Sequence, residues 1–204
     1  MKRVGLLGGA FNPPHLGHLK LAELALRHLE LDEVRFVPTA QSPHKTHPEG
    51  SPGPDSRMRL LREALAGLAL PFIAESLELE RGGTSYTVDT LEALSGREPD
   101  CAWILLLGSD QLPGLASWHR VARVLELAAL AVAPRPGFSL ELPKDLETRV
   151  RPRWSGAPGE LVWLPGTDLA FSSSVLRDRI LHGDDPIGLS PQVEAAIRRE
   201  NYYR

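Results

Sequence analysis

The sequence predicts an α/β protein built around a doubly wound parallel sheet, and three features of the chain carry that prediction. Strand-like and helix-like segments alternate along its length, as parallel sheets with crossover helices require. The runs 102–107 and 128–133 are continuously apolar between turn-forming residues, which is typical of strands covered on both faces. The first strand-like run, 3–8, ends in glycines, and glycines let a backbone pass close to a ligand.

The first half of the chain contains three strand-like and three helix-like segments. In order, we expect a strand at 3–8, a helix at 16–31, a strand at 34–37, a helix at 57–70, a strand at 71–79 and a helix from Thr84 or Ser85 to about Leu94. The stretch 38–54 is rich in Pro, Ser, Gly and His. It is too long for a passive connection, so it is either a functional loop or disordered.

The second half repeats the alternation and ends in helices. We expect a helix at 118–127 between the two buried strands, then a helix at 142–151, a strand at 161–164 and helices at 173–181 and 191–201. The last two helices form a small C-terminal helical part, about 172–204. The whole pattern is typical of a Rossmann-like sheet flanked by helices, which binds ligands at the carboxyl ends of its strands.

The composition is that of an ordinary globular protein, with 42% hydrophobic and 24% charged residues. A length of 204 residues suits one domain, 1–204. The single cysteine, Cys101, excludes an intrachain disulfide framework, and we expect it to be a core residue in a reducing compartment. No signal peptide or membrane-spanning stretch is visible. We therefore expect a cytoplasmic protein without a membrane partner, and the net charge of −3 argues against a nucleic-acid polymer as partner.

Glycines, prolines and two histidines are concentrated in residues 8–18, which read Gly-Gly-Ala-Phe-Asn-Pro-Pro-His-Leu-Gly-His. His15 and His18 are three residues apart at the start of a helix, so both imidazoles can face one point. A helix N-terminus already attracts anions through its free N–H groups. The imidazoles add hydrogen-bond donors, and the arrangement therefore suits a phosphate in transfer.

Other interpretations of this run are open. A Gly-Pro turn before a helix is common without any ligand. A histidine pair can bind zinc, but no third Cys, Asp or Glu stands nearby in a known pattern, and His-x-x-His without Glu is not the zincin motif. The run is not a P-loop, because Gly-Lys-Ser/Thr is absent, nor is it Gly-x-Gly-x-x-Gly.

A second candidate phosphate site lies at residues 171–177, which read Phe-Ser-Ser-Ser-Val-Leu-Arg. Serines are good N-caps and expose hydroxyl and N–H donors. Arg177, one turn on, can make bidentate contacts with phosphate oxygens. By itself the stretch fits a capped surface helix with an exposed arginine, but its occurrence together with the first motif favours a phosphate site.

The first run resembles the G-x-F-x-P-x-H-x-G-H motif of the nucleotidyltransferase superfamily, and the second resembles its I-S-S-T-x-x-R signature. The resemblance implies in-line attack on the α-phosphate of a nucleoside triphosphate, with loss of pyrophosphate and no covalent enzyme intermediate. It implies that His15, His18 and Arg177 are catalytic. The implied ATP-binding residues are these three together with Gly8, Gly9, Ala10, Phe11, Gly108, Ser172, Ser173 and Ser174.

Three positions depart from these superfamily motifs. The usual Asp is replaced by Asn12, which keeps a polar, turn-forming side chain but loses a charge. Phe171 stands in place of the usual Ile. Ser174 replaces Thr and retains the hydroxyl group, so the role in phosphate binding can survive.

Further blocks resemble bacterial nicotinate mononucleotide adenylyltransferases over nearly the whole chain. Residues 42–45 match a P-P-H-K-like loop, residues 85–91 match S-Y-T-x-D-T-L, and residues 108–110 match G-A-D. The seven-residue block is the most specific of these. The resemblance implies a mononucleotide site formed by Asn12, His44, Lys45, Thr87, Asp110, Trp118, His119 and Arg135.

The chemistry of several of these residues fits a nicotinate mononucleotide. Trp118 can stack on a pyridine ring, or it can be a core residue. The resemblance implies that Thr87 and the N–H groups around Trp118 and His119 bind the nicotinate carboxylate. Asp110 can hold a ribose hydroxyl or simply cap a helix.

The remaining basic residues have both a binding and a surface interpretation. Lys45 and Arg135 can neutralise the mononucleotide phosphate or be solvated charges. We interpret Arg57, Arg59 and Arg62 as a solvated basic face of the helix at 57–70.

Together these motifs predict transfer of the adenylyl group of ATP to nicotinate mononucleotide in NAD biosynthesis, with nicotinate adenine dinucleotide and pyrophosphate as products. We expect Mg²⁺ to arrive with ATP, held by phosphates and water rather than by protein side chains. The alternatives are a phosphopantetheine adenylyltransferase-like enzyme and a non-catalytic nucleotide-binding sensor. A monomer and a homodimer are both open, as is the preference for nicotinate over nicotinamide.

Overall fold

The structure is a computed structural model of the whole chain, in which residues 1–42, 48–166 and 171–204 are described. Its centre is a parallel sheet with the strand order β3-β2-β1-β4-β5-β6. The strands are β1 (Lys2–Gly9), β2 (Glu33–Pro38), β3 (Phe72–Ala74), β4 (Cys101–Gly108), β5 (Ala128–Ala133) and β6 (Leu161–Trp163). This order is that of a Rossmann-like doubly wound sheet, so the predicted fold class is confirmed.

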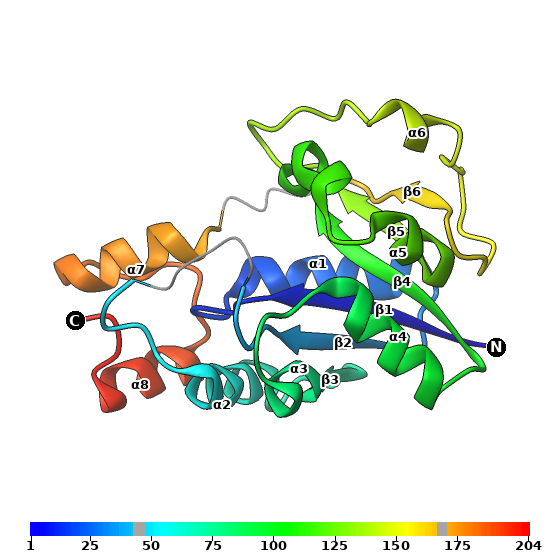
Figure 1. Cartoon of the computed structure of the whole chain (residues 1–204). Coiled ribbons are helices and arrows are strands. Elements are labelled where there is room, and N and C mark those ends of the chain that lie inside the picture. Colours follow the sequence, from blue (N-terminus) through cyan, green and yellow to red (C-terminus); the bar gives the residue numbers. More distant parts are fainter. Residues whose placement is uncertain (43–47, 167–170) are drawn as a thin grey trace.

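Helices cover both faces of the sheet and one end of it (Figure 1). They are α1 (Leu16–His28), α2 (Pro54–Leu65), α3 (Leu77–Arg81), α4 (Thr87–Arg97), the 3₁₀ helix η1 (Ser109–Ser117), α5 (Val121–Leu127), α6 (Lys144–Glu147), α7 (Ser173–His182) and α8 (Pro191–Glu200). No helix in the described ranges is long and apolar enough to cross a bilayer.

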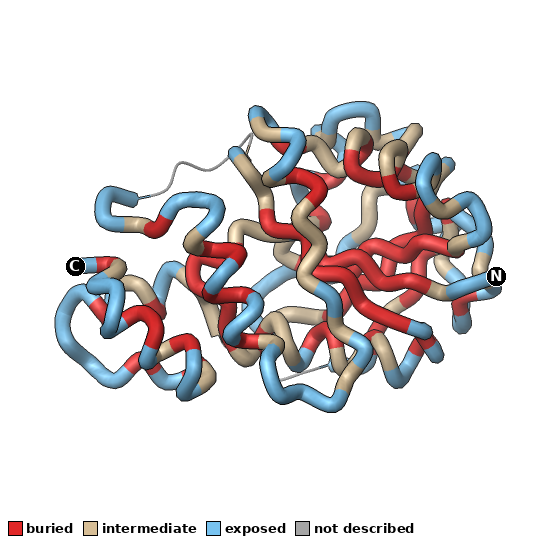
Figure 2. Tube along the Cα trace, turned by 90° about the horizontal axis from the view of Figure 1, so that it is seen from below, coloured by how far each residue is buried: buried red, intermediate tan, exposed pale blue. Residues whose placement is uncertain are grey.

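Side chains of the central strands alternate between two cores, one on each face of the sheet. On β4, Ile104 and Leu106 face the core that includes α1, whereas Leu105 and Leu107 face the core that includes α4. Figure 2 shows these strands buried along most of their length. Because both faces are covered, β4 and β5 are apolar at consecutive positions, which explains the continuous runs in the sequence.

The C-terminal helices α7 and α8 form a third core with α2, beyond the carboxyl end of β1 (Figure 1). Leu60 and Ala64 of α2 meet Leu176 of α7 and Val193 of α8 in this core. The packing holds α7 close to the carboxyl end of the first strand. This is the physical basis of the predicted C-terminal helical part.

Several predicted elements have different bounds or a different type. The expected strand at 71–79 is only β3, and its second half is the helix α3. The alternation of Leu77, Glu78 and Leu79 is too short to distinguish a strand from a helix. The helix expected at 142–151 is the single turn α6. The expected cap of α4 is also wrong, since α4 begins after Tyr86.

Two further predictions about residues 57–127 differ from the structure. The helix expected at 118–127 is present as α5 but begins only at Val121, and Trp118 lies between it and the preceding 3₁₀ helix η1. Arg57 was expected on a solvated face but is 0% exposed, whereas Arg59 and Arg62 are exposed as expected. The guanidinium of Arg57 is drawn inward because it satisfies three backbone carbonyl groups there.

Candidate active site

A cleft of about 520 Å³ lies at the carboxyl ends of β1, β4 and β5. Every candidate residue that the structure describes lines it: Gly8, Gly9, Ala10, Phe11, Asn12, His15, His18, Thr87, Gly108, Asp110, Trp118, His119, Arg135, Ser172, Ser173, Ser174 and Arg177. His44 and Lys45 lie outside the described residues. In the strand order, the connections run in one direction across the sheet from β1 and in the opposite direction from β4. The cleft lies at this switch point, where sheets of this type bind their ligands.

His15 and His18 form a stacked pair at the start of α1. Their ring centroids are 3.7 Å apart with the planes inclined by 25°. The backbone N–H of His15 donates to Nδ1 of His18 at 3.2 Å, and the ring of Phe11 meets His18 edge-on with centroids 4.9 Å apart. The predicted convergence of the two imidazoles on one region is therefore present in the structure.

Gly17 provides the space for this pair. A Cβ atom at position 17 would lie 2.9 Å from Nδ1 of His15 and 3.2 Å from Cβ of Phe171. Those separations are shorter than normal van der Waals contact, so any larger residue would displace the His15 ring or the segment before α7.

Both imidazoles are neutral near pH 7. Burial lowers the pKa of His15 to about 4, and the positive charge of Arg135 contributes in the same direction. Burial, followed by the nearby His15 and Arg135, holds the pKa of His18 well below its usual value. A neutral imidazole has one N–H donor and one acceptor, so in this state the pair offers hydrogen bonds rather than full positive charges.

The two sequence motifs are joined directly, although they lie about 160 residues apart. Arg177 donates to the backbone carbonyl oxygen of Asn12 at 2.7 Å and to Oγ of Ser174 at 3.2 Å. Oγ of Ser173 donates to the carbonyl oxygen of Pro13 at 3.1 Å. The N-terminus of α7 therefore faces the same space as the histidine pair, and both are suited to bind anions.

Arg135 and Asp110 form an ion pair in the cleft, at the ends of β5 and β4. Their nearest nitrogen and oxygen atoms are 3.1 Å apart, and Arg135 also donates to the carbonyl oxygen of Phe171 at 2.9 Å. The backbone N–H of Arg135 donates to Oγ of Ser109 at 3.0 Å. Arg135 is therefore a half-buried, oriented charge at the end of β5 rather than a freely solvated one.

An aromatic and hydrogen-bonding wall lies around the start of α4. Trp118 is half-buried against the core that includes α4 and also lines the cleft. The rings of Tyr86 and His119 lie with centroids 4.5 Å apart. Thr87 is the first residue of α4, so the free N–H groups of that helix open on this wall.

Sequence reasoning missed some residues that line the cleft, above all Glu78. Its side chain is 5% exposed, and Oε1 accepts a hydrogen bond from Oγ1 of Thr90 at 2.6 Å. Burial raises the pKa of its carboxyl group. A glutamate between Leu77 and Leu79 is the available signal, but the sequence predicts a strand for this segment, which leaves the position of the carboxyl group undefined.

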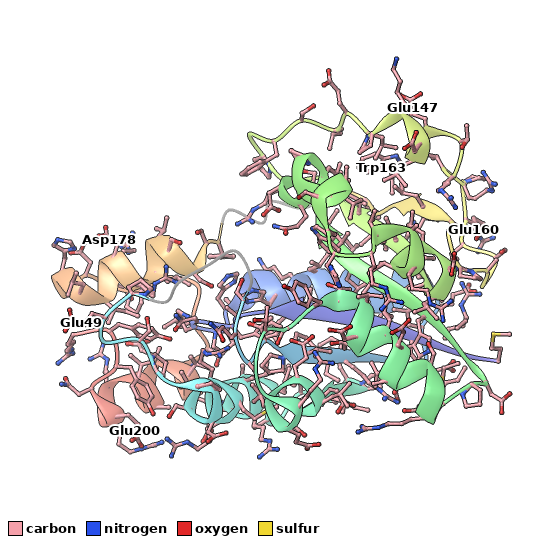
Figure 3. The ribbon with its side chains drawn as sticks, in the orientation of Figure 1. Glu49, Glu147, Glu160, Trp163, Asp178 and Glu200 are labelled. Atoms are coloured by element: carbon pink, nitrogen blue, oxygen red, sulfur yellow. The ribbon has the colours of Figure 1, made fainter. Side chains whose placement is uncertain are left out.

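The charge lining the cleft favours anions. In the described part of the chain, its acidic lining residues are Glu78 and Asp110, and Asp110 is paired with Arg135. Glu49, Asp178 and Glu200, labelled in Figure 3, are exposed and lie outside the lining. The described residues contain no group of three or more His, Cys, Asp or Glu side chains placed to hold a metal ion.

Comparison with known proteins places the chain in a family. Residues 6–179 match the cytidylyltransferase-like family. A Bordetella petrii protein is 39% identical over 207 residues, with all of both chains covered. A Geobacillus kaustophilus protein is 35% identical over 204 residues, covering 100% of this chain and 87% of the relative. Both carry the name "probable nicotinate-nucleotide adenylyltransferase".

This chain belongs to the nicotinate-nucleotide adenylyltransferase family. A solved structure of Plasmodium falciparum nicotinic acid mononucleotide adenylyltransferase complexed with NaAD has the same fold, with a TM-score of 0.79 and 17% identity. The alignment covers 100% of this chain and 98% of that one. The predicted family is confirmed, and the full-length relatives favour a nicotinate-nucleotide adenylyltransferase over the phosphopantetheine alternative.

Proposed function

We propose that this chain transfers the adenylyl group of ATP to nicotinate mononucleotide, forming nicotinate adenine dinucleotide and pyrophosphate. The observation that carries the proposal is that one cleft unites the histidine pair, the N-terminus of α7 and the wall around Trp118. A reaction between two phosphate-bearing substrates needs two adjacent anion sites. The histidine side and the Arg135 side supply them within one cavity.

The ATP half of the site is formed by the turn after β1 and by the start of α7. Gly8 and Gly9 allow close approach of the triphosphate to the backbone. Ser172 to Ser174 supply hydroxyl and N–H donors, and Arg177 supplies a positive charge beside them. His15 and His18 lie close to Arg135, whose charge acts on both imidazoles, and this suits contact with the α-phosphate.

The mononucleotide half is formed by Trp118, Thr87 and Arg135. The half-buried indole of Trp118 offers an apolar face for the pyridine ring. The N-terminus of α4 at Thr87 offers donors to the nicotinate carboxylate. Arg135 offers its charge to the mononucleotide phosphate, and Asp110 holds Arg135 in place or binds a ribose hydroxyl.

Catalysis in this arrangement rests on positioning and on electrostatic stabilisation. An oxygen of the mononucleotide phosphate attacks the α-phosphorus of ATP, and the bond from that phosphorus to the bridging oxygen breaks as pyrophosphate leaves. The neutral His15 and His18 donate hydrogen bonds to phosphate oxygens. Bound phosphate favours the protonated imidazole, because an opposite charge nearby raises the pKa of a histidine.

The side chains that line the cleft favour a Mg²⁺ ion that binds together with ATP over one that is held by protein ligands. Asp110 is engaged by Arg135, and Glu78 is buried with a raised pKa, so neither is a free carboxylate ligand. Phosphate oxygens and water molecules are then the ligands available to the ion. Mg²⁺ would neutralise charge on the β- and γ-phosphates and make pyrophosphate a better leaving group.

The test is pyrophosphate release from ATP and Mg²⁺ with three acceptors offered in parallel: nicotinate mononucleotide, nicotinamide mononucleotide and phosphopantetheine. We expect release to be fastest with the nicotinate compound. Faster release with the nicotinamide compound would revise the acceptor, and release only with phosphopantetheine would overturn the assignment of the mononucleotide half. If pyrophosphate is released with none of the three acceptors, a non-catalytic nucleotide-binding sensor becomes the better explanation.

A further inference from the structure

Arg57 of α2 is the largest fully buried side chain described, and its guanidinium binds three backbone carbonyl oxygens. Nη1 donates to the carbonyl of Ala10 at 2.6 Å. Nη2 donates to the carbonyls of Thr39 at 2.7 Å and Ala40 at 3.2 Å. One rigid planar fork therefore bridges the turn after β1 and the segment after β2.

A structural role alone is a poor explanation for this arginine. Among the described residues, no carboxylate forms an ion pair with Arg57, and its Nε atom has no hydrogen-bond partner. Burial lowers the pKa of the guanidinium, but an arginine remains protonated at neutral pH. A buried cation held only by neutral carbonyls costs more free energy than an apolar side chain of similar size.

The three carbonyls connect two walls of the cleft: the ATP wall, formed by the turn after β1, and the mononucleotide wall around the start of α4. Ala10 and Thr39 line the cleft, and Ala40 lies directly behind this lining. Ala10 lies in the turn that leads to the histidine pair. Ala40 is tied to the other wall, because its N–H donates to Oγ of Ser85 at 3.0 Å. The N–H of Ser85 in turn donates to the carbonyl of Gln41 at 2.9 Å, and Thr87 begins α4 two residues later.

Ser85 is also fixed from the side of α3. Its hydroxyl interacts with the buried carboxyl group of Glu78, which accepts a hydrogen bond from Thr90 of α4. The start of α4 therefore has little freedom relative to Ala40. Any shift of Ala40 relative to Ala10 would change the distance between the two walls.

We propose that Arg57 is a positioning residue that fixes the ATP wall and the mononucleotide wall of the cleft at the separation needed for in-line attack. The proposal rests on the proposed adenylyl transfer. Arg57 touches neither substrate in this proposal and acts through Ala10 and Ala40. Since a displacement of about 1 Å between reactants can cost roughly 100-fold in rate, the effect should appear in kcat rather than in the binding of either substrate alone.

The test compares Arg57→Lys and Arg57→Met with Arg62→Lys and Arg62→Met, which alter an exposed arginine of the same helix. For each variant we would measure kcat, the Kd of ATP alone and the Kd of nicotinate mononucleotide alone. Circular dichroism would give the folded fraction, by which kcat is corrected. We expect both Arg57 variants to lose about 10- to 100-fold in kcat while each Kd changes by less than about 3-fold. Lysine fails as well, because one compact ammonium group cannot span carbonyls on two segments.

A kcat per folded molecule within about 3-fold of the parent in Arg57→Lys would overturn the proposal. So would a loss of binding of each single substrate as large as the loss in kcat. If the Arg57 variants do not fold, Ser85→Ala tests the same link from the other wall. This variant removes the oxygen that accepts a hydrogen bond from the N–H of Ala40. We again expect kcat to fall while the Kd of each substrate alone stays nearly unchanged. An unchanged kcat would contradict the proposal. A parent protein without transferase activity would reject the proposed function instead, so the two failures are distinguishable.

Discussion

The hydroxyl of Tyr203 donates a hydrogen bond of 2.7 Å to Oδ1 of Asn12, inside the protein and across 191 positions of sequence. Burial raises the pKa of Tyr203, so its hydroxyl remains a donor throughout the physiological range. The backbone carbonyl of Asn12 meanwhile accepts from Arg177. Asn12 is expected in the mononucleotide site and lines the cleft. It also connects the first motif to Tyr203 through its side chain and to Arg177 through its backbone.

Replacing this tyrosine by phenylalanine should destabilise the protein. Tyr203→Phe removes one donor from the buried Asn12, and we expect the free energy of unfolding to fall by about 1–2 kcal/mol, as is usual for a lost buried hydrogen bond. Urea denaturation measures the change. Tyr202→Phe is the matched control, since the Tyr202 hydroxyl binds Arg59 at the surface. An equal decrease in the free energy of unfolding in both variants would show that the buried hydrogen bond to Asn12 stabilises the protein no more than the surface contact of Tyr202.

Removal of His18 should abolish most of the catalysis without loss of fold. We expect His18→Ala to lower turnover by about 100-fold or more, because a donor to the transferring phosphate is lost. Pyrophosphate release measures turnover, and circular dichroism checks the fold. His182→Ala, at an exposed histidine of α7, should behave as the parent does. Near-normal turnover in His18→Ala would exclude the catalytic role.

Enlarging Gly17 should impair activity through its neighbour. Gly17→Ala places a methyl group against the His15 ring, and we expect turnover to fall by about 10-fold or more. The comparison is Gly96→Ala in α4, where a Cβ atom meets nothing within 4 Å. That variant should keep full activity and gain up to about 1 kcal/mol of helix stability. Equal activity in the two variants would contradict the steric role of Gly17.

Trp118 should contribute to binding of one substrate only. We expect Trp118→Ala to weaken mononucleotide binding by about 3- to 10-fold, the usual worth of an aromatic stacking contact, with ATP binding nearly unchanged. Isothermal titration of each substrate alone gives both constants. Trp118→Phe should recover most of the loss, because a stacking face remains. Equal weakening for both substrates would mean that Trp118 acts only through packing.

The histidine pair should make the protein less stable in mild acid. The pKa of His15 is about 4 when folded and about 6.5 in an unfolded chain. Between these values only the unfolded state gains the proton, so the free energy of unfolding falls as the pH drops from 6.5 towards 4. His15 alone accounts for roughly 3 kcal/mol of this fall, and the lowered pKa of His18 acts in the same direction.

Denaturant titrations at pH 7 and pH 4 measure this dependence. His15→Asn cannot titrate in this range, so its stability should depend less steeply on pH than that of the parent. His182→Asn replaces an exposed histidine and should retain the parent's slope. Parallel slopes for His15→Asn and the parent would show that His15 does not resist protonation when folded.

The features that local sequence determines were predicted well. The apolar runs of β4 and β5 require strands covered on both faces, whatever the rest of the chain does, because no other arrangement hides so many consecutive apolar side chains. The spacing of His15 and His18 likewise brings the two rings together on any helix that begins there. These properties depend only on the periodicity of a strand or a helix.

Other features depend on which distant groups meet. Arg57 resembles Arg59 and Arg62 in the sequence, but only Arg57 folds inward and donates to backbone carbonyls of two distant segments. The neutral state of His15 follows from its burial beside Arg135, which lies 120 positions away. The sequence by itself therefore determined the sheet, the family and the chemical groups of the cleft. The tertiary structure decided their protonation and mutual placement, because burial and long-range hydrogen bonds exist only once the chain has folded.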